Sequence, residues 1–297
     1  MKILITGGTG LLGKALIDSR REGTQICATY VGEYVVENLE NVIYLNLDIK
    51  NREGYLDIFK KFRPEIVIHT ASIGSPDFAE KNKELTWSVN VVGTKNICAF
   101  CEEFGAKMVH ISSNGIYDGD NAPYAEDNIA KPINFYGVTK LEAENIVQKS
   151  NLIYSIVRPI LMYGWPYLFE RGNIVTIALS KLRKNEPINV YDDVYSNPLF
   201  VNSCAEVIWK IIYDRKYATY NVAGADRVSI FELVRKAADV FDLNQNLVVP
   251  VKQGYFNELV KRPHDTSYRT DKMEKMLKIQ PLTLEEGLGK MRLTKQV

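Results

Sequence analysis

The stretch Ile3-Leu4-Ile5-Thr6-Gly7-Gly8-Thr9-Gly10-Leu11-Leu12-Gly13 decides the fold of this chain. A short apolar run leads into a glycine-rich turn of the form Gly-x-Gly-x-x-Gly, and a helical pattern continues to Arg21. Such glycines permit a tight turn, let a pyrophosphate approach the backbone and let the helix pack closely on the strand. The phosphates then lie at the positive N-terminus of the helix. We therefore expect a dinucleotide site whose first contacts are Gly7, Thr9, Gly10, Leu11, Leu12 and Gly13.

Strand and helix patterns alternate beyond this turn. Strands are predicted at Gln25–Val31, Val42–Leu47, Glu65–His69, Ala106–Ile111 and Leu152–Val157. Helices are predicted at Leu11–Arg21, Arg52–Phe62, from Ser75-Pro76 to Phe104, and at Asn134–Ser150. This alternation indicates an α/β fold of the Rossmann type, a doubly wound parallel sheet with helices on both faces. Ligands bind at the carboxyl ends of such strands, which adds Thr29, Asp48, Ile49, Ala71 and Ser72 to the expected cofactor contacts.

The end of the second strand bears on the choice of cofactor. NAD enzymes usually carry an acidic residue there, which holds the ribose 2′-hydroxyl. This chain has Thr29, Tyr30 and Val31 at that point, with Glu33 two residues farther on. The missing acid favours NADP(H). No arginine occupies the position that would bind a 2′-phosphate, so NAD(H) is the alternative cofactor.

The alternation loosens after residue 163. We expect residues 1–163 to form the NAD(P)-binding domain and residues 164–297 to form a smaller, interleaved α/β lobe that binds the substrate. Its predicted helices are Asn173–Lys184, Asn202–Asp214, Ser229–Phe241, Thr266–Leu277 and Thr283–Leu293. Its predicted strands are Ile188–Tyr191, Thr219–Val222 and Leu247–Val251.

Composition narrows the class of protein. The chain has 297 residues and a formal net charge of +1, which gives no reason to expect nucleic acid or an anionic membrane as partner. No apolar run approaches the length of a membrane span. Four sparse cysteines and three scattered histidines predict reduced thiols, a cytoplasmic protein and no metal site.

A tyrosine and a lysine lie four residues apart, as Tyr136 and Lys140, within the predicted helix Asn134–Ser150. Residues at this spacing share one face of a helix. A free tyrosine has a pKa of roughly 10. A neighbouring ammonium would lower that pKa toward the range in which general acid–base catalysis is effective. Alone, the spacing also fits an ordinary surface pair.

Together with the glycine turn, these residues resemble the extended short-chain dehydrogenase/reductase family over essentially the whole chain. Asn90 is similar to that family's central structural asparagine, and Ser113, Tyr136 and Lys140 are similar to its catalytic set. The stretches 111–119, 132–144 and 262–267 resemble the dTDP-4-dehydrorhamnose reductase branch. One departure is Gly115, because that branch usually has an aromatic residue there.

The resemblance implies a reaction. NADPH would give a hydride to C4 of a nucleotide-linked 4-keto sugar, Tyr136 would donate a proton and Ser113 would polarise the carbonyl. Lys140 would lower the pKa of Tyr136 and bind the nicotinamide ribose, so Tyr136, Lys140 and Asn90 count among the cofactor contacts. Asn173 and Arg262 are candidates for the nucleotide or diphosphate of the substrate. We also expect a homodimer.

Two other functions remain open. A nucleotide-sugar epimerase, which recycles a tightly held NAD, fits Ser112, Ser113 and Tyr117. A dehydratase is disfavoured, because Asn114 and Gly115 stand where dehydratases of the family place an Asp-Glu pair. The branch also contains the regulatory beta subunit of methionine adenosyltransferase, which acts by binding a partner.

Overall fold

A seven-stranded parallel sheet is the centre of the molecule. The computed structural model describes residues 1–294, so the last three residues of the predicted lobe 164–297 lie outside the described residues. The strand order is β11-β6-β5-β4-β1-β2-β3, with every neighbouring pair parallel. The strands are β1 Lys2–Thr6, β2 Gln25–Tyr30, β3 Val42–Asn46, β4 Ile66–His69, β5 Lys107–Ile111, β6 Tyr154–Pro159 and β11 Thr219–Val222. The predicted doubly wound parallel sheet is confirmed.

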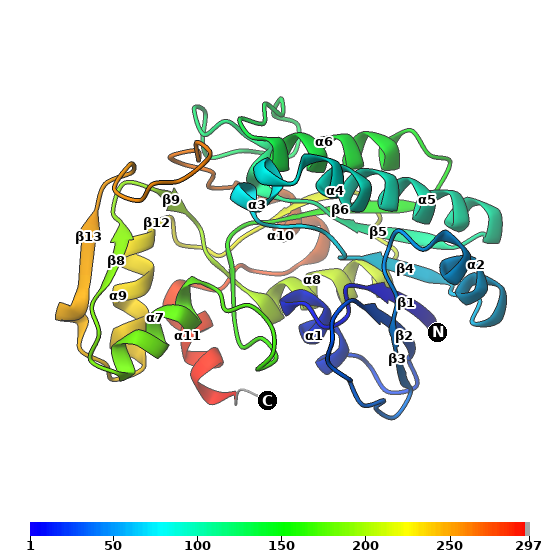
Figure 1. Ribbon diagram of the computed structural model, residues 1–297, viewed down its shortest axis with the longest axis horizontal. Helices are drawn as coiled ribbons and strands as arrows, with labels where there is room; N and C mark the ends of the chain where they lie inside the picture. Colours follow the sequence, from blue (N-terminus) through cyan, green and yellow to red (C-terminus); the bar gives the residue numbers. More distant parts are fainter. Residues whose placement is uncertain (295–297) are drawn as a thin grey trace.

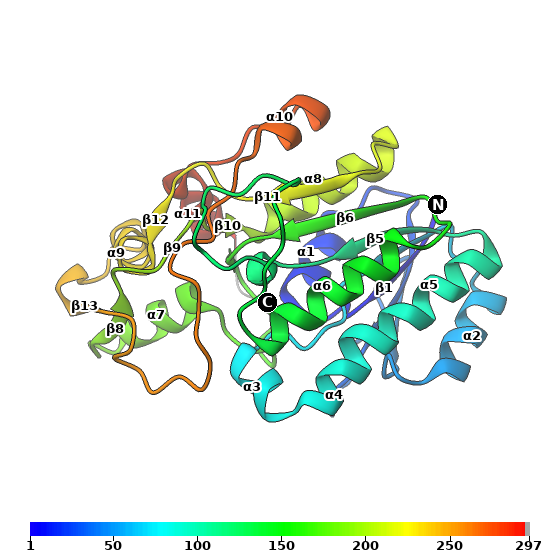
Figure 2. The same cartoon turned by 90° about the horizontal axis from the view of Figure 1, so that it is seen from above.

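Helices cover both faces of the sheet (Figures 1 and 2). On one face lie α1 Leu11–Asp18 and α8 Val201–Asp214, which pack against each other. On the other lie α2 Arg52–Lys61, α5 Gly93–Phe104 and α6 Phe135–Gln148. Successive residues of a strand point to opposite faces, so Ile3 and Ile5 join the first core while Leu4 joins the second. The apolar runs of the strands follow from this burial on two sides.

The segment between β4 and β5 is not the single helix that the sequence predicted. It contains α3 Pro76–Lys81, α4 Lys83–Trp87, a π-helical turn Ser88–Val92 and α5. The break is at Asn82, whose backbone leaves the helical region (φ −128°, ψ 57°). Its side-chain amide donates to the carbonyl of Phe78 at 3.0 Å. Asparagine competes with the helix for backbone hydrogen bonds in this way.

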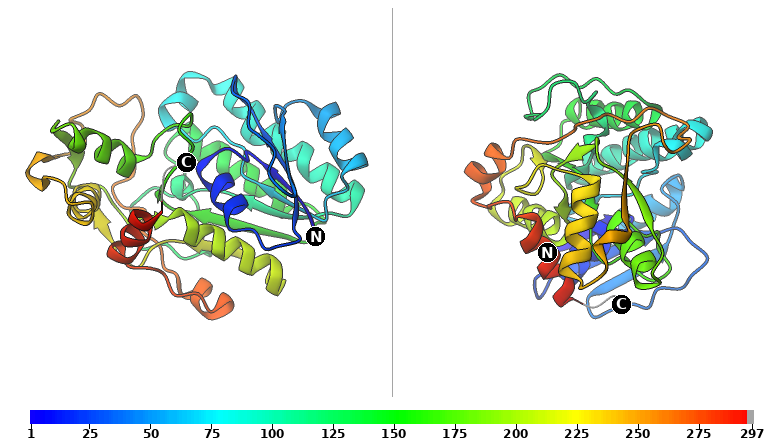
Figure 3. Two further views of the ribbon diagram at one scale, coloured as in Figure 1. Left: turned by 90° about the horizontal axis from the view of Figure 1, so that it is seen from below. Right: turned by 90° about the vertical axis from the view of Figure 1, so that its left-hand side faces the viewer.

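A second group of elements stands beside the sheet, toward the viewer in the right-hand view of Figure 3. Its members are α7 Ile174–Arg183, β8 Ile188–Tyr191, α9 Ile230–Val240, β13 Val248–Val251 and α11 Leu284–Leu293. Capping boxes begin all three of these helices, at Asn173, Ser229 and Thr283. Short ladders join β7 Met162–Tyr163 to β10 Leu199–Phe200 and β9 Tyr195–Ser196 to β12 Val228–Ser229. Two 3₁₀ turns lie at Asn114–Ile116 and Gln245–Leu247.

The chain crosses between the two groups. Both α8 and β11 come after residue 164, yet they belong to the large sheet and its helical layer. The left-hand view of Figure 3 shows α8 beneath that sheet. The boundary at residues 163 and 164 stays a prediction.

The predicted helix Thr266–Leu277 is wrong over its first five residues, because α10 spans only Asp271–Leu277. The preceding stretch is extended against Tyr124. The amide of Tyr124 donates to the carbonyl of Ser267 at 2.8 Å, and the amide of Arg269 donates to the carbonyl of Tyr124 at 2.9 Å. These distant partners use the backbone groups that a helix would need.

Candidate functional site

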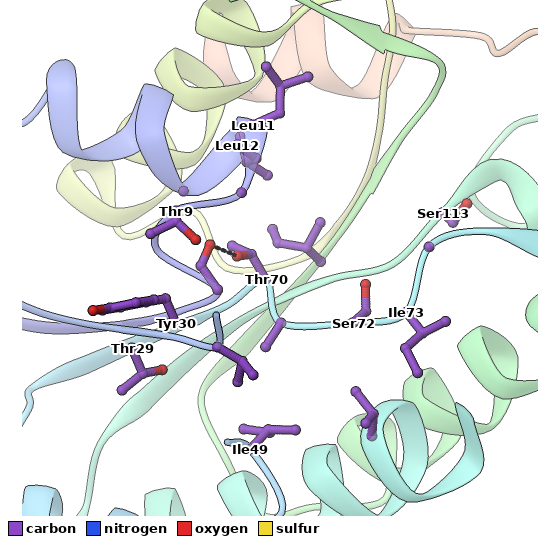
Figure 4. A pocket seen from close by; sticks show the side chains of 18 of the residues that line it. Thr9, Leu11, Leu12, Thr29, Tyr30, Ile49, Thr70, Ser72, Ile73 and Ser113 are labelled. Carbon is purple, nitrogen blue, oxygen red and sulfur yellow. Dashed lines mark hydrogen bonds between the residues drawn. The ribbon is translucent and has the colours of Figure 1, made fainter. Parts of the chain in front are cut away.

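A cavity of about 760 Å³ opens at the carboxyl ends of the parallel strands. The glycine turn and the end of β2 lie at one end of it, and Ser113 lies at the other (Figure 4). Most of the predicted cofactor residues line this cavity: Gly7, Thr9, Gly10, Leu11, Leu12, Gly13, Thr29, Asp48, Ile49, Ala71, Ser72 and Tyr136. Asn90 and Lys140 do not line it.

The glycine turn is built for a close approach of the helix. The amide of Gly10 donates to the carbonyl of Gly7 at 3.1 Å, and α1 begins at the next residue, Leu11. A Cβ atom at Gly13 would lie 2.3 Å from the same carbonyl oxygen, so only glycine permits this packing. The first residues of α1, Leu11 to Gly13, line the cavity at the end where a pyrophosphate would fit.

The end of β2 supplies no charge. Thr29 is buried, and its hydroxyl shares a hydrogen bond of 2.7 Å with the hydroxyl of Tyr55. Asp48 lines the cavity beside Lys50, whose ammonium lies 3.3 Å from the Asp48 carboxylate. The sequence did not predict Lys50 as a lining residue, although it follows directly after two residues that were predicted.

Ser113 and Tyr136 meet at the inner end of the cavity. The ring of Tyr136 lies over Gly115, where a Cβ atom would stand 3.0 Å from the ring. Gly137 allows α6 to come this close, because a Cβ there would lie 2.1 Å from the carbonyl oxygen of Gly115. The Ser113 hydroxyl accepts a hydrogen bond of 3.0 Å from the amide of Gly115, so it also caps the backbone. Burial raises the pKa of Tyr136, and its hydrogen bond with Ser113 opposes that rise.

Lys140 lies behind the tyrosine and is buried. Its ammonium donates to the carbonyl of Ile111 at 2.7 Å, at the end of β5. Burial lowers the pKa of Lys140 to about 8, and the carboxylate of Glu144 opposes this. Lys140 therefore remains mainly protonated at neutral pH. It is not among the groups that lower the pKa of Tyr136 in this structure.

Two buried histidines lie near Lys140, at the ends of β4 and β5. His69 and His110 are paired in the sheet, and their rings are 5.6 Å apart. Burial and the charge of Lys140 lower the pKa of both, to about 3 for His69. They are therefore neutral and add no charge to the site. Among residues 1–294, no group of three or more His, Cys, Asp or Glu side chains could hold a metal ion.

Asn90 is a structural link beneath the cavity. Its side chain accepts from the amide of Ile73 at 2.8 Å and donates to that residue's carbonyl at 3.1 Å. It also donates to the hydroxyl of Thr139 at 3.0 Å, one residue before Lys140. Ile73 lines the cavity, so Asn90 joins the cavity wall to the helix that carries Tyr136 and Lys140.

The two predicted substrate residues stand outside the cavity lining. Asn173 caps α7, and its side-chain amide donates to the carbonyl of Gly164 at 2.7 Å. Arg262 forms ion pairs of 2.7 Å with both Asp77 and Glu258. Their roles toward a substrate stay predictions.

Several lining residues had no separate prediction. Thr70 and Ile73 flank the predicted Ala71 and Ser72, so the rule that ligands bind at strand ends could have found them. Asn114 follows β5, and its side-chain amide donates to the hydroxyl of Thr266 at 2.7 Å, which joins the inner cavity wall to the second group of elements. Glu170 also lines the cavity. It lies in an irregular loop, where neither periodicity nor a motif pointed to it.

The sequence of this chain is similar to a known protein family and to several of its members. The family model described as "RmlD substrate binding domain" matches residues 1–296. The chain belongs to this family. It is 28% identical over 282 residues to methionine adenosyltransferase 2 subunit beta of Xenopus laevis, covering 93% of this chain and 82% of that protein. It is also 28% identical over 307 residues to dTDP-4-dehydrorhamnose reductase of Aggregatibacter actinomycetemcomitans, covering 98% of each.

Solved structures agree with the fold. A dTDP-4-dehydrorhamnose reductase of Bacillus anthracis in complex with NADP superposes with a TM-score of 0.87 at 28% identity, covering 98% of both chains. A dTDP-glucose 4,6-dehydratase of the same organism in complex with NAD has a TM-score of 0.83 at 17% identity, a likeness of fold alone. The predicted resemblance to the short-chain dehydrogenase/reductase fold and to the dTDP-4-dehydrorhamnose reductase branch is confirmed.

Proposed function

We propose that this family member is an NADP(H)-dependent reductase of a nucleotide-linked 4-keto sugar, with NAD(H) as a second usable cofactor. One observation carries the proposal: Ser113 and Tyr136 line the same cavity as the glycine turn. The glycine turn lines the cavity and leads directly into α1, the arrangement that holds a pyrophosphate in dinucleotide folds. The reductase relatives, one of them in complex with NADP, support the assignment.

The roles of the side chains follow from their positions. The cofactor supplies the hydride when bound. Ser113 donates a hydrogen bond to the carbonyl oxygen of the sugar and stabilises the developing alkoxide. Burial raises the pKa of Tyr136. Its phenol is therefore protonated at neutral pH and can donate a proton to that oxygen. Lys140 holds a positive charge behind the tyrosine and near the carbonyl end of β5.

The direct test is reduction of substrate by the purified full chain. NADPH should be oxidised only when a 4-keto sugar nucleotide is added, which the absorbance of the reduced nicotinamide reports. Unchanged absorbance across a panel of such sugars would contradict the proposal. Mass spectrometry of the protein as purified distinguishes an epimerase from a reductase. Tightly bound NAD favours an epimerase, and a site that is empty or exchanges its cofactor favours a reductase.

A second candidate is a regulatory subunit. The similarity to methionine adenosyltransferase 2 subunit beta supports it, because that relative is named as a subunit of another enzyme. Affinity purification from native extract should then recover a stoichiometric methionine adenosyltransferase. Recovery of this chain alone as a homodimer, in the cytoplasmic fraction, agrees with the reductase proposal.

A further inference from the structure

A loop just past the middle of the chain reaches over the cofactor end of the cavity. It comprises residues 164–173 and connects β7 to α7 (the green loop near α1 in Figure 1). Its aromatic side chains pack on the segment that follows β2. The rings of Phe169 and Tyr34 stack with centroids 3.9 Å apart, and Tyr167 and Phe169 stack at 5.1 Å. The hydroxyls of Tyr167 and Tyr44 share a hydrogen bond of 3.2 Å, which ties the loop to β3 as well.

These contacts place the Glu170 carboxylate between the glycine turn and the chain after β2. Its Oε1 atom accepts from the hydroxyl of Thr9 at 2.8 Å and from the hydroxyl of Tyr34 at 2.7 Å. Burial raises the pKa of Tyr34 to about 12, so this phenol stays a donor. The Oε2 atom accepts no hydrogen bond from residues 1–294, and the side chain lines the cavity. One oxygen is therefore fixed and the other is free for a ligand.

The position of Glu170 suits it to replace the acid that is missing from the end of β2. In dinucleotide folds an acid at the end of the second strand holds the ribose 2′-hydroxyl of the adenosine half. Here that strand ends in Thr29 and Tyr30, while Glu170 brings a carboxylate to the same place from a distant loop. Apart from Glu170, the charged lining residues of the described chain are Asp48 and Lys50, which pair with each other. Lys14, beside Tyr167, is paired with Asp18 at 2.6 Å.

We propose that Glu170 is a cofactor-specificity residue, which accepts a hydrogen bond from an adenosine ribose hydroxyl and opposes a 2′-phosphate at that position. The inference rests on the proposed function, because it assumes a nicotinamide dinucleotide in this cavity. A carboxylate next to a 2′-phosphate is repulsive, and no unpaired cation among the lining residues compensates it. Glu170 thus reduces the advantage of NADP(H) and keeps NAD(H) usable.

The test measures the affinities of the full chain for NADP⁺ and NAD⁺ by calorimetry. Glu170→Gln keeps an oxygen for Thr9 and Tyr34 but removes the charge. Its ratio of Kd for NADP⁺ to Kd for NAD⁺ should fall by about tenfold, the scale of one close charge pair in a partly exposed site. The matched control is Glu33→Gln, an exposed acid shortly after β2, whose ratio should stay within about twofold of wild type because screening weakens exposed charges.

A second measurement does not depend on a variant. Added salt should lower the same ratio in the wild-type protein, since it screens the repulsion, and should change it less in Glu170→Gln. An unchanged ratio in Glu170→Gln, with both cofactors still bound, overturns this inference and leaves the proposed function standing. So does a shift that appears in Glu33→Gln instead. Failure of the wild-type chain to bind either dinucleotide overturns the proposed function and this inference together.

Discussion

At the scale of residues, Tyr136 offers the sharpest test of catalysis. Tyr136→Phe deletes one hydroxyl and keeps the ring that packs on Gly115. Turnover should fall by about two to four orders of magnitude, the range attributed to general acid–base groups. Cofactor affinity should change little, because the glycine turn is untouched. Steady-state kinetics with NADPH and a 4-keto sugar nucleotide measure the first effect, and calorimetry measures the second.

The matched control is Tyr213→Phe. The Tyr213 hydroxyl has no hydrogen-bond partner among the described residues, and its ring lies near the amino ends of the strands, away from the cavity. This variant should keep wild-type turnover. Near-normal turnover in Tyr136→Phe would exclude Tyr136 as the proton donor. Loss of folding in Tyr136→Phe alone would make the tyrosine a structural residue.

The lowered pKa of Lys140 predicts how the free energy of unfolding depends on pH. Its pKa falls from 10.5 to about 8 in the folded chain because of burial. Between these values the unfolded chain binds more protons than the folded one, so the free energy of unfolding rises with pH. Relative to Lys140→Met, the wild-type protein should therefore gain up to about 3 kcal/mol between pH 8 and pH 10.5. Below pH 8 the difference between the two proteins should be constant.

Urea denaturation of both proteins at several pH values gives this difference, and the other titrating groups cancel in it. Parallel stability curves would contradict the lowered pKa. Lys140→Met should also lose activity, and the loss should not add to that of Tyr136→Phe, since the two residues act as a unit.

Residues that follow a strand end or a motif were predictable from the sequence, and Glu170 was not. The glycine turn and the residues after β3 and β4 line the cavity as expected, because parallel strands bring their carboxyl ends together. Glu170 is 161 residues away from its partner Thr9 and lies in an irregular loop. Stacking of Phe169 on Tyr34 holds it there, and no local pattern encodes such a long-range contact.

At the scale of elements, Asn90 joins three parts of the site, and its loss should be costly. Asn90→Ala would leave the partly buried amide and carbonyl of Ile73 without their side-chain partner and would free Thr139, whose bond to Asn90 is buried. An unsatisfied buried group costs about 1–3 kcal/mol, and water can reach the Ile73 groups, so the free energy of unfolding should fall by roughly 1–3 kcal/mol. Urea denaturation measures it. Asn145→Ala is the control, because within residues 1–294 the Asn145 side chain bonds only its helical neighbour Glu142, at 3.2 Å. A loss no larger than the control's would contradict the linking role.

Elements with local causes were also the ones the sequence predicted well. The helix that begins after Ser229 has its capping box within four residues of sequence, and it forms as expected. The two wrong helices had competing partners. Asn82 breaks the helix between β4 and β5 through its own side chain, and Tyr124 holds Thr266–Thr270 extended from far along the chain.

At the scale of the whole molecule, the loop that follows β13 of the second group of elements contacts α3. Arg262 and Asp77 form this contact at 2.7 Å, and the amide of Leu259 donates to the same carboxylate at 3.2 Å. The next residue after Asp77, Phe78, lines the cavity. The bridge therefore lies close to the cavity wall, although Arg262 does not line it. No helix among the described residues has the length and apolar character to cross a membrane.

The role predicted for Arg262 can be separated from a purely structural one by charge. If Arg262 binds the substrate diphosphate, Asp77 competes with the substrate for the guanidinium. Asp77→Asn should then lower KM and Arg262→Lys should raise it, each by roughly tenfold, the scale of one charge-assisted hydrogen bond. If Arg262 only holds its loop on α3, both substitutions break the same bridge and should change KM in the same direction.

Turnover should stay near wild type in either case, because Ser113 and Tyr136 are untouched. Arg227→Lys serves as the control, since Arg227 is likewise paired with a carboxylate, Asp265, at 2.7 Å and does not line the cavity. Opposite shifts of KM in Asp77→Asn and Arg262→Lys, with none in Arg227→Lys, would place the diphosphate of the substrate at the junction of the two groups of elements.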